Sequence, residues 1–260
     1  MSKSRTRTGE PLIRWVLALS LSLAAAPGAA QILEDVAIVD SPTAGILPHG
    51  GYLFLGSVGP QSGLLFAVKV GFFDRAQLGI SFGLQKFIGR GEIEVNDKPG
   101  FEVKLRVIEE SEAGPAIALG IDTQGEDSYV EEDERYERKS KGFYAVFSKN
   151  YRLIEDFSIH GGVNYSLEKR DESGVNAFAG FELGLVKGLS LLLDYNPALD
   201  DNDTGVPSHR TRGRGYLDAG ARVDYRDNLR FKLLFKDLLG NYLPETGVFR
   251  SVEVYYVNAF

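Results

Sequence analysis

The chain has 260 residues, of which 43% are hydrophobic and 25% are charged, with 30 glycines, no cysteine and a formal net charge of −7. The lack of cysteine excludes disulfides, cysteine-based metal sites, thiol nucleophiles and a lipoprotein anchor. A mean hydropathy of −0.13 is typical of an ordinary globular domain and does not by itself exclude a transmembrane barrel. After residue 30 no run of 18 or more apolar residues occurs, which argues against membrane-spanning helices and leaves open a transmembrane barrel, whose strands alternate apolar and polar residues.

Residues 1–30 predict a cleaved secretory signal peptide. Basic residues up to Arg14 precede the apolar run 15–26, and the small residues Gly28 and Ala30 occupy the −3 and −1 positions of a cleavage site. The alternative, an anchoring helix, is disfavoured because the apolar run is too short to span a bilayer. Cleavage would remove four basic residues and one acidic residue and leave a net charge of −10. So acidic a chain is a poor candidate for binding nucleic acid.

Residues 31–50 form an irregular lead-in segment. Proline and glycine punctuate it, and no sustained hydrophobic period is present. We expect it to lie under the following domain or to enter it.

Residues 51–260 predict one antiparallel transmembrane β-barrel of about 12 strands. The stretch 142–169 shows the repeating unit, because Phe143 and Phe147 alternate with Tyr144 and Ser148 in an arm about as long as a tilted strand that crosses a bilayer. Further segments with this period follow at regular intervals. The expected strands are 51–58, 64–72, 77–87, 101–108, 116–122, 142–150, 157–167, 176–185, 189–195, 215–225, 229–236 and 251–260.

The connections between these strands alternate in length, as they do in bacterial outer-membrane barrels. The tight ones are 73–76, 109–115, 151–156, 186–188 and 226–228. The long polar ones are 88–100, 123–141, 196–214 and 237–250, and 59–62 is short where a long loop is allowed. We expect the long loops to be extracellular and the tight turns periplasmic.

The C-terminal segment agrees with this prediction. It ends in VEVYYVNAF, in which Val252, Val254, Tyr256 and Phe260 alternate and Asn258 interrupts the pattern. Outer-membrane barrels commonly end on an aromatic residue that the barrel assembly machinery reads, so this machinery is an expected partner, together with outer-membrane lipid and lipopolysaccharide.

Several segments resemble the YjbH-type family of outer-membrane barrels. They are DSPTAGILPHGGY, KPGFEVKLRVIEES, ALGIDTQG, KGFYAVFSKNY, HGGVNYSLE and RGRGYLDAGARVDYRDNLRFKLLFKDLL, which together span nearly the whole chain after the signal peptide. The resemblance implies the barrel fold, an outer-membrane location and an association with exopolysaccharide export, with export components as partners. The chain has one barrel's worth of sequence, whereas better-known members of the family are longer.

No catalytic, metal or cofactor site is predicted. His49, His160 and His209 do not share the spacing of metal ligands, and no phosphate-binding glycine loop occurs. Ser158 and His160 share one strand face, as in an outer-membrane lipid hydrolase, but this face should point to the lumen and away from the lipid. A lipid hydrolase is therefore only the third hypothesis for function.

The faces expected to point inward are rich in charge, with seven basic and seven acidic residues and one histidine. The expected lumen-lining residues are Lys69, Glu102, Lys104, Arg106, Asp122, His160, Glu182, Asp194, Asp218, Arg222, Asp224, Arg230, Lys232, Lys236 and Glu253. Opposite charges on neighbouring strands should pair along the wall. The first hypothesis is a narrow, weakly selective, non-enzymatic channel or an accessory barrel for export, and the alternative is a closed barrel that acts through its extracellular loops.

The same alternation predicts how single substitutions act. Arginine at the lipid-facing Phe231 should destabilise the barrel by about 2–4 kcal/mol near the membrane midplane. Arginine at the inward-facing Lys232 should cost little.

Overall fold

A computed structural model describes residues 34–59, 63–85, 87, 94–95, 98–130, 134–152, 156–168, 174–202, 211–242 and 247–260. The predicted signal peptide, residues 1–30, lies outside these ranges, as does His209.

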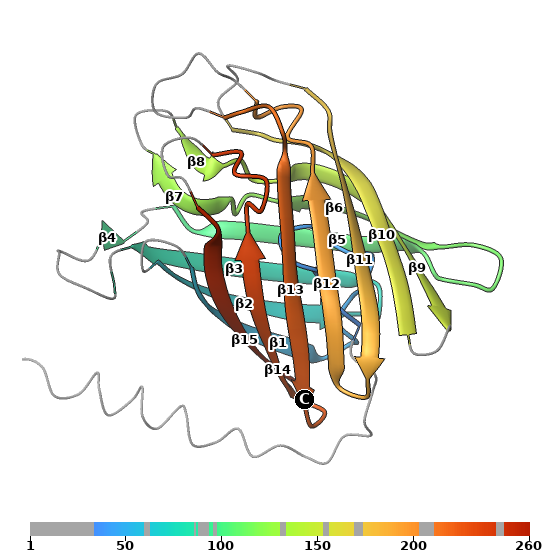
Figure 1. The fold of residues 1–260 in the computed structure, drawn as a ribbon. Helices are drawn as coiled ribbons and strands as arrows, with labels where there is room; N and C mark the ends of the chain where they lie inside the picture. The colour runs from blue at the N-terminus through green and yellow to red at the C-terminus, as the bar shows by residue number, and fades with distance from the viewer. Residues whose placement is uncertain are drawn as a thin grey trace, which may run out of the picture.

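Twelve long antiparallel strands close into one barrel (Figure 1). The ring runs β2, β1, β15, β14, β13, β12, β11, β10, β9, β6, β5, β3, and pairing of β2 with β3 closes it. β4 extends the sheet beside the end of β3, and β7 pairs with β8 in a separate two-stranded sheet. The strands are β1 Gly51–Val58, β2 Leu64–Phe72, β3 Ala76–Gln85, β4 Glu94–Val95, β5 Gly100–Ile108, β6 Ala116–Asp122, β7 Glu126–Val130, β8 Arg135–Arg138, β9 Gly142–Arg152, β10 Asp156–Tyr165, β11 Asn176–Val186, β12 Leu189–Asn196, β13 Tyr216–Tyr225, β14 Leu229–Lys236 and β15 Phe249–Ala259.

The predicted barrel of about twelve strands is confirmed, and its strand ends differ from the prediction by at most two residues. The sequence did not predict β4, β7 and β8, which lie within the expected long loops. These strands are two to five residues long and rich in charged residues, so the period that marks a barrel strand is missing from them.

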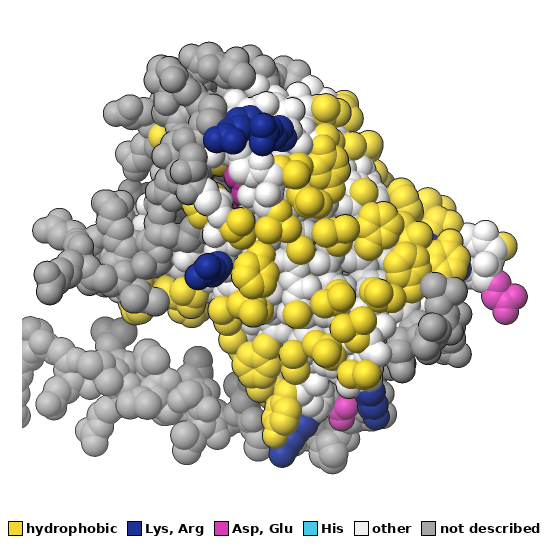
Figure 2. Space-filling model, viewed as in Figure 1, with side chains coloured by type: hydrophobic (Ala, Val, Ile, Leu, Met, Phe, Trp, Pro, Cys, Tyr) yellow, Lys and Arg dark blue, Asp and Glu magenta, His cyan; other side chains and the backbone are white. Residues whose placement is uncertain are grey.

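The outer face of the barrel is apolar. Leu78, Phe101, Val103 and Leu233 expose 45–53% of their surface, and hydrophobic side chains cover the barrel wall between its ends (Figure 2). The inward positions between them carry polar and charged residues, as at Glu102. A closed barrel that is apolar outside and polar inside satisfies its backbone hydrogen bonds within lipid, and the protein is an outer-membrane β-barrel. Within the described ranges, no helix has the length and apolar character needed to span a membrane.

The two ends of the barrel differ. The tight turns and the C-terminus lie at one end, whereas β7, β8 and the longer connections lie at the other (Figure 1). In the β2–β3 turn, which joins Phe72 to Ala76, Phe73 and Asp74 both have φ of +56°, the left-handed conformation that suits a tight turn between twisted strands. We call these the turn end and the loop end.

The lead-in segment enters the barrel. Residues 34–50, which we call the lumen hairpin, have most of their side chains buried, including Val36, Ile38, Ala44 and Leu47. The sequence left open whether the lead-in lies under the barrel or enters it, and the structure shows that residues 34–50 lie inside the barrel.

Candidate functional site: the occupied lumen

The lumen hairpin folds back on itself within the barrel. Ala37 bridges Pro42, the Ile38 N–H donates to the Ser41 carbonyl at 3.0 Å, and the Thr43 N–H donates to the Val36 carbonyl at 3.2 Å. Its two limbs approach so closely that a Cβ atom at Gly45 would lie 2.2 Å from the Asp35 carbonyl oxygen. Glycine at this position is therefore required for the fold-back.

The hairpin enters and leaves at the turn end. The His49 N–H donates to Asp74 Oδ1 at 2.8 Å, and the Phe73 N–H donates to His49 Nδ1 at 3.1 Å, which ties the second limb to the β2–β3 turn. At the tip, Asp194 near the loop end of β12 accepts hydrogen bonds from the Asp40 and Ser41 N–H groups and from the Ser41 hydroxyl, at 2.6–3.0 Å. The hairpin thus extends along the lumen from the turn end towards the loop end.

Apolar contacts fix the hairpin against three parts of the wall. Val36 and Leu47 pack with Leu53, Tyr255 and Val257. Ile38 and Val39 pack with Leu192 and Leu234 of the wall, and Ala44 packs with Tyr144 and Phe178 among others. These wall residues point inward and would be exposed to water if the lumen were empty. The inner face of the wall therefore carries apolar side chains where the apolar side chains of the hairpin lie against it.

Two buried lysines bind the backbone of the hairpin. Lys232 Nζ donates to the Ala37 and Ile38 carbonyls at 2.7 and 2.8 Å, and Lys104 Nζ donates to the Val36 and Gly45 carbonyls at 2.8 and 3.3 Å. Neither lysine side chain is exposed. This revises the expectation that arginine at position 232 costs little, because a larger guanidinium must displace the hairpin carbonyls that the ammonium now holds.

Carboxylates of the hairpin bind cations of the wall. Asp35 forms ion pairs with Arg222 and Arg230, and Asp40 pairs with Lys236 at 2.6 Å and with Arg138 at 3.2 Å. Burial raises the pKa of Asp40, but Lys236 and Arg138 outweigh burial and lower this pKa to about 2. Asp40 is therefore ionised, and its ion pairs persist at neutral pH.

The tip of the hairpin is also joined to the loop-end sheet. Arg138 of β8 contacts Asp218 of the wall at 3.1 Å as well as Asp40, and Lys236 contacts Glu126 of β7 at 2.7 Å as well as Asp40. These five residues, which we call the tip network, connect the lumen hairpin to both the barrel wall and the β7–β8 sheet.

All fifteen residues expected to line the lumen lie on barrel strands with their side chains turned inward, but many of their partners differ from the expectation. Wall-to-wall pairs do occur, such as Lys69 with Glu102 and Glu182 with Arg222. The lumen hairpin takes up a further set: Lys104, Arg106, Asp194, Arg222, Arg230, Lys232 and Lys236. The remaining residues bond elsewhere: Asp122 to the Gln124 N–H, His160 to Ser148, Asp218 to Arg138, Asp224 to Arg222 and Arg230, and Glu253 to Tyr255.

Ser158 and His160 do not form the pair that a hydrolase would need. The Ser158 hydroxyl donates to Asn150 Oδ1 at 2.5 Å, whereas His160 Nδ1 lies 2.8 Å from the Ser148 hydroxyl. Ser148 in turn accepts the Ala44 N–H of the hairpin at 2.7 Å. The buried Ser148–His160 pair therefore faces the hairpin inside the lumen, and the described residues place no carboxylate on His160 Nε2.

Sequence reasoning missed the hairpin residues that do the binding, chiefly Asp35, Asp40 and Ser41, and also Arg138 of β8. One signal was present: the apolar run Val36–Val39 is flanked by Asp35 and Asp40, unlike the polar surface expected of a solvated lead-in.

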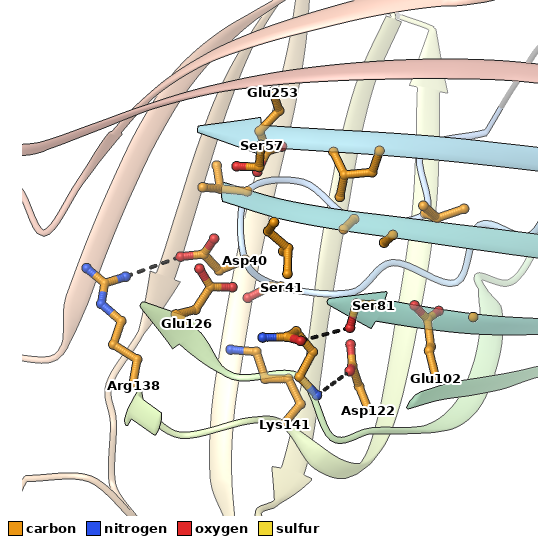
Figure 3. A pocket seen from close by; sticks show the side chains of 18 of the residues that line it. Asp40, Ser41, Ser57, Ser81, Glu102, Asp122, Glu126, Arg138, Lys141 and Glu253 are labelled. Atoms are coloured by element: carbon orange, nitrogen blue, oxygen red, sulfur yellow. Dashed lines mark hydrogen bonds and ion pairs between the residues drawn. The ribbon is translucent and has the colours of Figure 1, made fainter. Parts of the chain in front are cut away.

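Two of the cavities bordered by the described residues lie near the ends of the hairpin. The inner vestibule at the turn end has a volume of about 440 Å³ and is lined by Glu182, Arg222, Asp224 and Arg230 among others. The outer chamber has a volume of about 140 Å³ and lies between the hairpin tip, the barrel wall and the β7–β8 sheet, with Asp40, Ser41, Glu126 and Arg138 at its border (Figure 3). Hairpin residues line the outer chamber, and Asp35 of the hairpin binds Arg222 and Arg230 of the inner vestibule.

Comparisons with known proteins identify no family. No family model matches the chain, and no curated protein matches it. Among solved structures, the chain is similar to the KdgM porin (TM-score 0.46, 8% identity, covering 81% of this chain and 99% of that one) and to the NanC porin (0.45, 9%, 80% and 99%). It is also similar to the COG4313 outer membrane channel from Pseudomonas putida F1 (0.39, 12%, 82% and 97%).

Proposed function

We propose that the protein is a channel-type outer-membrane barrel that its own lumen hairpin closes at rest, and that it passes small polar solutes when the hairpin is displaced. One observation carries the proposal: the hairpin runs along the lumen from one charged cavity, whose Arg222 and Arg230 bind Asp35, to a second charged cavity that Asp40 and Ser41 line. Moving this hairpin would join them without any change in the strands.

Ion pairs between the hairpin and the barrel wall help to hold the hairpin in the lumen. Asp35 and Asp40 sit at the two ends of the first limb. Asp35 contacts three cations of the wall, Arg222, Arg230 and Lys232, and Asp40 contacts two, Lys236 and Arg138. Loss of either carboxylate leaves its buried cations with one acidic partner fewer, and the surplus positive charge in a site with little water is relieved when water enters. The wall exposed by hairpin release carries both signs of charge, so the open pore should select weakly by charge.

Single-channel recording in planar bilayers tests the proposal. We expect the wild type to be silent or to open rarely, deletion of residues 34–47 to give a steady conductance, and the Asp35→Ala/Asp40→Ala double variant to open often. Gly45→Ala should also open the pore without removing any charge, because its methyl group forces the two limbs apart. Gly56→Ala on β1, where the nearest atoms to a new Cβ lie 3.9 Å away, is the matched control and should behave as the wild type.

Silence of the deletion variant would refute the channel proposal. Wild-type conductance equal to that of the deletion variant would show that the hairpin does not close the lumen. Heat-modifiable gel mobility checks that each variant has folded.

A second candidate is a permanently closed barrel that acts through its loop end. The apolar contacts of Val36, Ile38 and Leu47 with the wall favour it, because a hairpin that leaves must expose these side chains and their partners to water. The recordings separate the two candidates, since a closed barrel stays silent in the Asp35→Ala/Asp40→Ala variant.

The link to exopolysaccharide export rests on the resemblance to the YjbH-type family alone and stays a proposal. A narrow lumen that also houses a hairpin favours an accessory role over direct passage of a polymer. Copurification of the barrel with export components from native membranes would test it.

A further inference from the structure

The β7–β8 sheet lies at the loop end of the barrel and is separate from its wall (Figure 1). Its strands pair with each other, Tyr129 with Tyr136 and Val130 with Arg135, and no barrel strand that the structure describes pairs with either of them. We call residues 125–130 and 134–141, which contain this sheet, the lid. Because no backbone ladder joins the described part of the lid to the wall, the lid can move without opening a strand pair of the barrel.

The lid and the tip of the lumen hairpin border the same cavity. Glu126, Arg138 and Lys141 of the lid line the outer chamber together with Asp40 and Ser41 of the hairpin (Figure 3). A change in the position of the lid therefore changes the surroundings of the tip.

Side chains from neighbouring connections hold the lid in place. Glu168, which follows β10, accepts the Tyr136 N–H at 2.9 Å with one oxygen and the Ser140 N–H at 2.8 Å with the other. Asp201, which follows β12, forms an ion pair with Arg135. These contacts are polar, and they fasten the lid without touching the hairpin.

The hairpin tip lies against an acidic part of the wall. Asp194 accepts three hydrogen bonds from the tip, as an ionised carboxylate does, and Asp218 is a second wall carboxylate within electrostatic reach of Asp40. Lys236 is the wall cation that pairs with Asp40, at 2.6 Å. Of these four groups, three are acidic and one is basic, so the wall alone holds the charge of the tip poorly.

Arg138 of the lid bridges the tip to this part of the wall. Its Nη1 atom lies 3.2 Å from Asp40 and 3.1 Å from Asp218, and its guanidinium lies over the Tyr216 ring, 4.1 Å from the ring centroid. One cation of the lid thus joins a carboxylate of the hairpin to a carboxylate of the wall. Without it the two carboxylates would repel each other in a confined space, where charges interact strongly.

The other charged groups of the lid add to this effect. Lys141 is within electrostatic reach of Asp40 and Asp194, whereas Glu126 returns one negative charge by its contact with Lys236 at 2.7 Å. Together with Arg138, these lid groups bring a net charge of +1 to an acidic site. Undocking of the lid removes that charge from the tip.

We infer that the lid is a latch for the lumen hairpin: while it is docked, its cations hold the acidic tip against the acidic wall, and its undocking releases the tip. The role of the latch in conduction rests on the proposed channel function. The coupling between the lid and the hairpin does not, because it is measured without any conductance.

Hydrogen exchange of the folded full-length protein, measured by mass spectrometry on residues 34–50 and 134–141, tests the latch. Glu168→Ala frees two lid amides and, among the contacts of the described residues, touches no hairpin residue. We expect faster exchange in the lid and exchange in the hairpin that is roughly five- to hundredfold faster, the range of coupling between sites in proteins. Glu110→Ala is the matched control, because Glu110 also accepts a backbone N–H, that of Asn150 at 2.9 Å, but at the turn end.

Two further variants test the route of the coupling. Arg138→Met removes the bridge itself and should speed hairpin exchange as Glu168→Ala does. Coupling is reciprocal, so Asp40→Ala in the hairpin should speed exchange in the lid. In the Asp40→Ala background, Glu168→Ala should accelerate the hairpin less than it does in the wild type.

Hairpin exchange at the wild-type rate while the lid of Glu168→Ala exchanges faster would overturn the inference. If Glu168→Ala leaves the lid protected, unchanged hairpin exchange in Arg138→Met overturns it instead. Equal acceleration of the hairpin in Glu110→Ala would also overturn it, since the effect would then be a general loss of stability. Hairpin exchange that follows the lid in a barrel whose deletion variant stays silent in bilayers would support the latch and refute the channel.

Discussion

Replacing Lys232 by methionine tests how the lumen hairpin is held. Methionine matches the lysine side chain as far as Cε and lacks the ammonium, so it removes both hydrogen bonds to the Ala37 and Ile38 carbonyls and the 3.9 Å contact of Nζ with Asp35. A hydrogen bond to a charged group contributes about 1.5–3 kcal/mol, so the gross loss is about 3–6 kcal/mol. Part of this is offset because the fully buried ammonium no longer has to be desolvated, a cost of several kcal/mol. We expect a net weakening of hairpin docking by about 2 kcal/mol.

Hydrogen exchange measured by mass spectrometry on residues 34–50 reads this change directly, since a local opening governs exchange of the hairpin amides. A weakening of about 2 kcal/mol corresponds to roughly thirtyfold faster exchange. Lys149→Met is the matched control, because Lys149 Nζ binds Glu110 and the Ser111 carbonyl in the β5–β6 turn and does not touch the hairpin. Hairpin exchange that is unchanged or slower in Lys232→Met would refute the reasoning, and slower exchange would show that desolvation of the ammonium outweighs its hydrogen bonds.

Three further outcomes are expected. Phe231→Arg on the lipid face should lower the free energy of unfolding in lipid vesicles by about 2–4 kcal/mol, whereas Phe73→Arg in a turn should lower it by less than about 1 kcal/mol. Equal losses would contradict the assignment of Phe231 to the lipid-facing surface. A cysteine at Leu199 should react with an impermeant thiol reagent on intact cells, and one at Arg226 only after the outer membrane is opened; the reverse pattern would invert the orientation. Burial and then Asp201 raise the pKa of Asp200 to about 6 from an ordinary 3.8, so protonation favours the folded state, and the wild type should gain stability relative to Asp200→Asn as pH falls from 7 to 4; a constant difference in thermal midpoint would contradict this.

The barrel could be predicted from the sequence because its signals are local. Leu78, Ile80 and Phe82 alternate with Gly79 and Ser81 within a single strand, and the sheet pairs that strand with its sequence neighbours. The inward direction of the charged residues follows from the same alternation. Nothing beyond neighbouring residues is needed to make either prediction.

The partners of the lumen charges could not be predicted in this way. Asp35 pairs with Arg222 and Arg230 across 187 and 195 residues of chain, and Asp40 with Lys236 across 196. The lead-in has no hydrophobic period, so its sequence does not indicate which wall residues it will lie against. Its contacts form only once the barrel has closed around it. The same holds for Arg138, whose strand pairs outside the barrel and reaches the hairpin tip only because the loop-end sheet sits over the lumen.

The position of the lumen hairpin directly before β1 has a consequence for assembly. β1 pairs along its whole length with β15, the last strand of the chain, and the Phe260 N–H at the very end donates to the carbonyl of Gly50, the last residue of the hairpin. Three of the cations that bind the first limb, Arg222, Arg230 and Lys232, come from β13 and β14, which follow most of the barrel in the chain. Pairing of β1 with β15 therefore brings the hairpin next to these late strands, so that the contact that closes the wall also fixes the position of the segment inside it.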